Sequence, residues 1–175
     1  MATRAPKTLS KIRRKKGLEG LNRAIANEQD IVMVILRAHL LTENLLEQLI
    51  LAGLSRGDRI LDEGNLTYYQ KLILTAALDL LPDPIISSLR NLNKVRNDCA
   101  HQLEKTITEN DVSKIGTSLG KKFVEIRHEA NFDDLTVLRH LLYYVVGAMS
   151  GTLHGREARQ IVVHKKKRAL KESNK

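Results

Sequence analysis

The chain of 175 residues has few of the residues that build sheets or cross-links. It has no tryptophan, and aromatic residues make up only 3% of it, which is poor material for a β-sheet. Its single cysteine, Cys99, excludes an internal disulfide and a cysteine-based zinc site, so we expect a cytoplasmic location with reducing conditions. No apolar run approaches the roughly 18 residues that span a membrane, and no apolar segment follows the basic N-terminus as in a signal peptide. We therefore expect a soluble protein of one domain, with no membrane partner.

The net charge of +9 is unevenly distributed along the chain. Residues 1–17 carry seven basic and no acidic side chains, and residues 156–175 carry eight basic and two acidic ones, so the remainder is acidic overall. We predict a basic mobile arm over residues 1–17, a domain over 18–164 and a basic tail over 165–175. Such tails attract nucleic acid by releasing counterions, although a solubilising role is the alternative. The residues predicted to bind nucleic acid are Lys11, Arg13, Arg14, Lys15, Lys16, Lys165, Lys166, Lys167 and Arg168.

Apolar residues recur with a helical period, so the sequence predicts an all-α bundle of about four to five helices. The predicted helices cover about residues 28–53, 67–81 and 83–101, then begin near Thr108 and near Asp133 or Asp134, the last continuing to about Val163. Gly57–Gly64 is predicted to be a connector with room for one helical turn. Asp83 is the predicted N-cap of the third helix, and Pro84 its first helical residue. Thr108 and Asp111 resemble a capping box.

Three glycines in the last predicted helix allow two interpretations. Gly147, Gly151 and Gly155 recur every four residues and therefore share one stripe of a helix. Such a stripe permits close approach of another helix, from the same chain or from a partner. The low helix propensity of glycine equally favours a break near Gly151.

The segment from Arg96 to His101 carries chemistry that suits a phosphate group. Arg96 offers a forked, permanently charged set of donors that matches phosphate oxygens. His101 can take and give a proton near neutral pH, and Asn97 can orient either group. The alternative is structural, since a helix-terminal arginine and histidine can also satisfy the last carbonyls of a helix.

The ending LNKVRNDCAH resembles the RN-x-x-AH ending of the prokaryotic members of the HEPN superfamily, many of which are metal-independent ribonucleases with an Arg-x4–6-His motif. Upstream, LLTENLLEQLI is similar to the first helix of that family, and YYQKLILTAALDLLPDPIISSLRNLNKVRND is similar to its second and third helices. The resemblance covers roughly residues 28–125. More distantly, the layout resembles the mannitol-operon repressor, a relative that acts as a regulator.

This resemblance implies a HEPN-like helical bundle that dimerises and cleaves RNA without a metal or another cofactor. It implies that His101 is the general acid or base, that Arg96 stabilises charge on the phosphate, and that Asn97 holds one of them in place. A toxin or defence role, with a protein antitoxin or regulator as partner, is common in the superfamily. The alternative is a non-catalytic regulator, like the mannitol repressor, that binds protein or nucleic acid.

Other side chains are candidate helpers of this site. The first helix of the family often presents a carboxylate toward the motif, which makes Glu43 and Glu47 candidates; the alternative is that both are solvated or capping carboxylates. His39 and Glu43 are helix neighbours that either point into the site or form a surface pair. The pairs Tyr68-Tyr69 and Tyr143-Tyr144 are more typical of core or interface residues than of base-stacking platforms.

Overall fold

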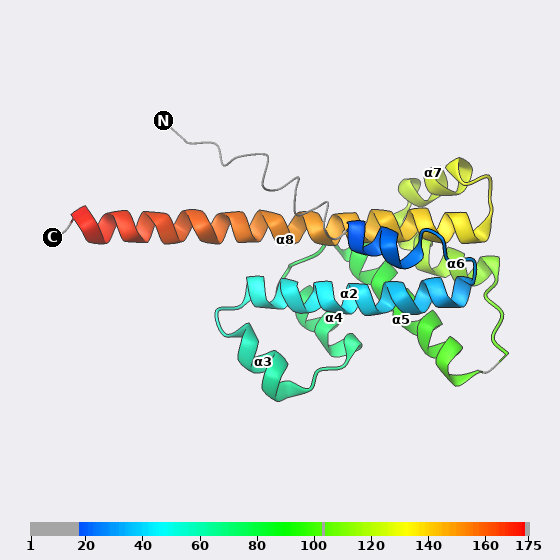
Figure 1. Cartoon of the computed structure of the whole chain (residues 1–175), viewed down its shortest axis with the longest axis horizontal. Helices are drawn as coiled ribbons and strands as arrows, with labels where there is room; N and C mark the ends of the chain where they lie inside the picture. The colour runs from blue at the N-terminus through cyan, green and yellow to red at the C-terminus, as the bar shows by residue number, and fades with distance from the viewer. Residues whose placement is uncertain (1–17, 103, 174–175) are drawn as a thin grey trace.

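The computed structural model describes residues 18–102 and 104–173, with side chains through residue 156. The described residues form helices, turns and loops without a strand, so the predicted all-α class is confirmed (Figure 1). The helices in chain order are a short helix over residues 18–25, α2 (Ile31–Gly53), α3 (Gly57–Gly64), α4 (Tyr68–Ala77), α5 (Asp83–His101), α6 (Glu109–Gly116), the 3₁₀ turn η1 (Thr117–Leu119), α7 (Lys121–Glu129) and α8 (Asp134–Ser173).

Helix α2 is the centre of the bundle and packs against α4, α5 and α8. Its N-cap is Asp30, whose side chain accepts a hydrogen bond from the backbone N–H of Val32 at 2.8 Å. This N-cap satisfies a backbone donor that has no partner within the helix. The face of α2 that points inward is apolar at helical spacing and completely enclosed at Val34, Ile35 and Leu46. Burial of this stripe fixes the rotation of α2 and therefore decides which of its polar side chains face α4 and α5.

The bundle has more helices than the four to five predicted. Gly57–Gly64, predicted to be a connector, is the helix α3. A Cβ at Gly57 would lie 3.0 Å from the backbone oxygen of Ile50, so glycine favours the close start of α3 beside α2. Asn65, in the left-handed conformation with φ of 43°, ends the helix.

Helix α4 ends at Ala77, four residues before the predicted end at residue 81. Asp79 has a φ of 49°, which turns the chain out of the helix. Leu80 and Leu81 are nevertheless buried, so their apolar character reflects packing after the turn and not another turn of helix.

The starts of the next two helices test two predicted caps. The N-cap of α5 is Pro82, one residue before the predicted Asp83, and Asp83 is the first helical residue. The predicted capping box is confirmed at α6, where Thr108 and Asp111 bond reciprocally. The segment after Thr108 divides into α6, η1 and α7, because Gly120 turns the backbone with a φ of 57°.

Helix α8 corrects the predicted helix end near Val163. It continues through Ser173 and projects beyond the packed helices (Figure 1). Its last part contains no proline or glycine and is rich in Lys and Arg, which favour helix, so the run of like charge does not end it. The interpretation of a break at Gly151 is also wrong. Gly147 is buried, whereas a Cβ at Gly151 or Gly155 would meet no other described atom within 4 Å.

Candidate functional site

A cleft of about 430 Å³ lies between α2, the start of α4 and the second half of α5. Its lining includes Arg96 and Asn97, two of the predicted catalytic residues, and Glu43, one of the predicted helpers. His39, Asn93 and Thr67 add further polar side chains to the lining. The cleft therefore holds donors and acceptors from helices that are distant in the sequence.

Helix α5 supplies one wall of the cleft. Arg96 and Asn97 follow Asn93 by three and four residues, so both lie on the face of the helix that carries Asn93. A terminal guanidinium nitrogen of Arg96 donates a hydrogen bond to Oδ1 of Asn97 at 3.2 Å. Both side chains are half-buried, which restricts them more than a fully solvated position would.

His101 lies apart from this wall. It is the last residue of α5, is exposed, and does not line the cleft. The helical spacing places it one turn beyond Asn97. The single chain therefore brings together Arg96 and Asn97 of the predicted catalytic residues, but not His101.

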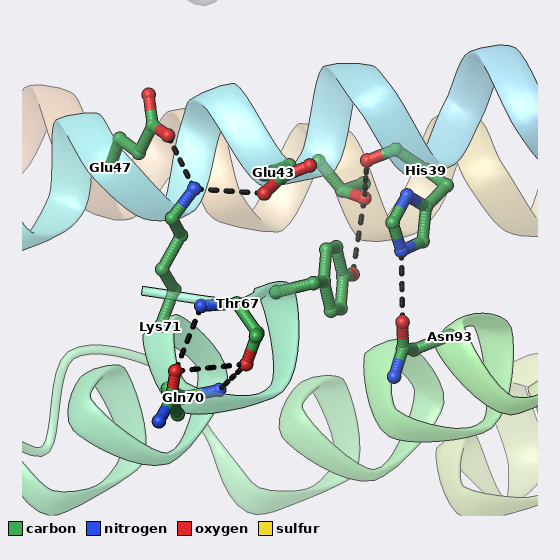
Figure 2. Close-up of polar contacts among 9 residues, drawn as sticks. His39, Glu43, Glu47, Thr67, Gln70, Lys71 and Asn93 are labelled. Carbon is green, nitrogen blue, oxygen red and sulfur yellow. Dashed lines mark hydrogen bonds and ion pairs between the residues drawn. The ribbon is translucent and has the colours of Figure 1, made fainter. Parts of the chain in front are cut away.

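His39 faces α5 from α2, so it is part of the site and not half of a surface pair. It is 5% exposed, and its Nε2 lies 2.9 Å from Oδ1 of Asn93 (Figure 2). Its ring stacks on Tyr68 with 4.1 Å between ring centroids. Burial lowers the pKa of His39 below its ordinary value, against the hydrogen bond to Asn93, which raises it, and the charge of Arg96 lowers it further. The neutral ring is therefore the form that this site favours at neutral pH.

Lys71 of α4 joins the two predicted helper carboxylates. Its Nζ lies 2.8 Å from Glu43 and 2.6 Å from Glu47, and the residue is 8% exposed (Figure 2). Burial acts to lower the pKa of Lys71, but the hydrogen bonds and charges of both carboxylates outweigh it and raise the pKa. Lys71 is therefore charged. Glu43 lines the cleft, whereas Glu47 contacts Lys71 outside the lining.

The tyrosines divide between core and surface. Tyr68 is buried, and its hydroxyl lies 3.1 Å from Oγ1 of Thr42, so it belongs to the core as the sequence favoured. Tyr69 is 46% exposed on the lining of the cleft, where its ring is available for stacking. Tyr143 donates a hydrogen bond to Oδ1 of Asn22 at 2.6 Å, and Tyr144 is exposed on α8.

Sequence reasoning missed Asn93 and Lys71. Asn93 had a signal, because it precedes Asn97 by one helical turn and therefore shares its face. Lys71 also had one, because it falls in the buried register of Tyr68, Leu72 and Thr75 on α4. A lysine in such a register needs a carboxylate partner, which only the packing of α2 identifies.

The predicted nucleic-acid-binding residues lie mostly beyond what the structure describes. Lys11, Arg13, Arg14, Lys15 and Lys16 fall outside the described residues. The backbone of Lys165–Arg168 is helical within α8, and their side chains are not among those described.

Among the described residues, no group of three or more His, Cys, Asp or Glu is placed to hold a metal ion. None of the described helices combines the length and apolar character needed to cross a membrane.

Comparison with known proteins assigns no relative to the chain. No protein-family model, no curated protein and no solved structure matches it.

Proposed function

We propose that the chain is a metal-independent endoribonuclease of the HEPN type, whose site combines the cleft with His101. The observation that supports this most is that Arg96 and Asn97 line one cleft with His39 and Glu43. A guanidinium in a partly enclosed groove binds a phosphodiester more strongly than a solvated one, because less water competes for its donors.

The reaction needs no group beyond the side chains present and the RNA itself. The 2′-hydroxyl oxygen attacks the adjacent phosphorus while a base removes its proton, and the bond from phosphorus to the 5′-oxygen breaks. The leaving 5′-oxygen takes a proton from an acid, which gives a 2′,3′-cyclic phosphate and a 5′-hydroxyl. Arg96 stabilises the charge that develops on the phosphorane, and His101 moves a proton. Glu43, on the same lining, is an acceptor for a ribose hydroxyl.

A second copy of the chain completes this site in our proposal. His101 is outside the lining of the cleft in one chain, whereas the resemblance to the HEPN superfamily implies that two clusters meet across a two-fold axis. A homodimer with facing clusters would bring His101 of one chain toward Arg96 of the other. The basic arms would attract the RNA, because the acidic body does not. A toxin or defence role, held in check by a protein antitoxin, is the expected biological setting.

We predict that Arg96→Ala and His101→Ala each abolish RNA cleavage, and that cleavage by the parent chain continues in EDTA. Loss of a general acid or base costs about 10²–10⁴ in rate, and loss of a charge-stabilising group costs a similar factor. Both residues are half-buried or exposed near a helix end, so the fold should survive. The measurement is single-turnover cleavage of a labelled RNA, with the product ends identified by mass.

Matched controls are Arg90→Ala, exposed on the same helix, and His128→Ala, exposed on α7. Both should cleave like the parent chain. Cleavage that stops in EDTA, or that survives His101→Ala, contradicts the mechanism.

A second function, RNA or protein binding without cleavage, is favoured by the exposed position of His101 outside the lining. Binding that depends on Arg96 but not on His101, with every tested RNA left intact, would support this regulator.

A further inference from the structure

The carbonyl oxygens of two cleft asparagines are both occupied by donors of the chain itself. Oδ1 of Asn93 pairs with Nε2 of His39, and Oδ1 of Asn97 accepts from Arg96. Figure 2 shows the amide nitrogen of Asn93 on the side away from His39. Among the described residues, neither amide nitrogen has a hydrogen-bond partner. Each asparagine therefore has one partner on its carbonyl oxygen and keeps both N–H donors for a ligand.

The environment of His39 fixes which way this pair is arranged. Its Nδ1 is buried and has no partner among the described residues. If the Asn93 amide were flipped and Nε2 accepted a hydrogen bond from its NH₂ group, the ring hydrogen would lie on Nδ1 as a buried donor without an acceptor, which is costly. With the hydrogen on Nε2, the ring donates to Oδ1 of Asn93, and only a lone pair is left on Nδ1. The lowered pKa of His39 disfavours the third arrangement, in which both nitrogens carry hydrogen.

The two walls of the cleft carry opposite charges. Arg96 lies on the α5 wall of the cleft together with Asn93 and Asn97, and Glu43 lies on the α2 wall. Glu43 keeps an acceptor oxygen, since Lys71 contacts Oε1. An anion is therefore attracted to the α5 wall and repelled from Glu43, which suits a ligand with phosphate at one end and hydroxyl or N–H donors at the other.

We infer that Asn93 is an anion-binding residue, held in its donor orientation by His39, and that with Arg96 and Asn97 it forms a site for the phosphate group of a phosphate ester. This deepens the proposed function and rests on it only for the identity of the ester as RNA. His39 is a positioning residue, because its free nitrogen is buried and it acts through Asn93.

Inorganic phosphate is a probe of this site that involves no cleavage. We expect its addition to shift the side-chain NH₂ resonances of Asn93 and Asn97 in a saturable manner, with one dissociation constant. The NH₂ resonance of Asn44, exposed on α2, should not move. The readout is specific to each residue, so phosphate bound by basic residues elsewhere does not contribute. Asn93 resonances that do not respond to phosphate would overturn the inference.

Substitutions then separate positioning from packing. Asn93→Leu should weaken phosphate binding about 10- to 100-fold, as expected for the loss of a hydrogen bond to a charged group. His39→Leu should weaken it by a similar factor, whereas His39→Gln, which keeps an N–H donor at this place, should restore most of the binding. In the Asn93→Leu background, His39→Leu should have no further effect.

Additive losses in the double variant would overturn the positioning role of His39, because a merely structural effect would not depend on Asn93. Asn44→Leu is the matched control and should bind like the parent chain. If phosphate binds as expected but no RNA is cleaved, this inference stands and the proposed ribonuclease activity falls.

Discussion

Among the described carboxylates, that of Asp111 has the most strongly shifted pKa. It is 4% exposed and accepts hydrogen bonds from Nζ of Lys105 at 3.0 Å and from the backbone N–H of Thr108 at 3.2 Å. Burial acts to raise the pKa of Asp111, but the hydrogen bonds of Lys105 and Thr108 outweigh it and lower the pKa to about 2. The charged form is therefore a part of the fold at neutral pH.

We predict that Asp111→Asn lowers the free energy of unfolding by about 2 kcal/mol at neutral pH, from the difference between about 2 and the ordinary value. A folded pKa below the unfolded one adds stability above the unfolded value of about 3.9, and that stability is lost as the pH falls through the folded value. The difference between the two chains should therefore shrink at about pH 2. Urea unfolding at both pH values measures it, and an equal difference at both would contradict the assignment.

For individual residues, the sequence predicted some hydrogen-bond partners and not others. Asp111 was predictable as a capping residue, because its partner Thr108 is three residues away. The pairing of His39 with Asn93 joins residues 54 apart in sequence, so no local pattern reveals it. Arg96 and Asn97 were singled out because adjacent residue types carried the signal, whereas the exposure of His101 depends on where α5 ends.

Two glycines in helices are predicted to respond oppositely to substitution by alanine. A Cβ at Gly151 would meet nothing described within 4 Å, so Gly151→Ala should stabilise the fold by about 0.5–1 kcal/mol through helix propensity. A Cβ at Gly116 would lie 2.2 Å from the ring of Phe123, a core residue, so Gly116→Ala should destabilise it. Thermal unfolding of both variants provides the comparison.

The two variants control for each other, since each adds one methyl group to a helix. If Gly151→Ala destabilises a dimer but not a monomer, the glycine stripe of α8 contacts a second chain.

Helix ends were predictable where a local interaction sets them. Gly53 ends α2 as predicted, and the capping box of Thr108 begins α6. The helix α3 was missed because its glycine termini resemble a loop and its start depends on contact with α2. The end of α8 was missed because charge was taken as a sign of a tail, although helix propensity was favourable throughout.

For the whole molecule, the all-α fold class was predictable from the sequence, whereas the packing of the helices and the number of chains were not. Composition and period gave an all-α fold, since few aromatic residues and an abundance of Leu, Ala, Lys and Glu leave little alternative. The cleft depends on the packing of α2 against α4 and α5, which no single segment encodes. The number of chains per active unit stays a prediction.

We predict that two inactive variants restore activity to each other. In a mixed dimer of Arg96→Ala and His101→Ala chains, the second chain supplies Arg96 and the first supplies His101. If the site joins Arg96 of one chain to His101 of the other, one intact site forms, and mixing after partial unfolding and refolding should recover cleavage. The assay compares the mixture with each variant alone, and sedimentation measures the dimer. No recovery in a confirmed mixed dimer would mean that each chain works with its own pair.

The enclosure of Lys71 also gives the chain a natural reporter of movement. A lysine amine attacks an acylating reagent only when that amine is accessible and uncharged, and Lys71 is neither while it stays between Glu43 and Glu47. The reagent can reach Lys71 only when α4 separates from α2, and that separation also takes apart the cleft. The rate at which Lys71 becomes labelled therefore records how often the walls of the cleft come apart.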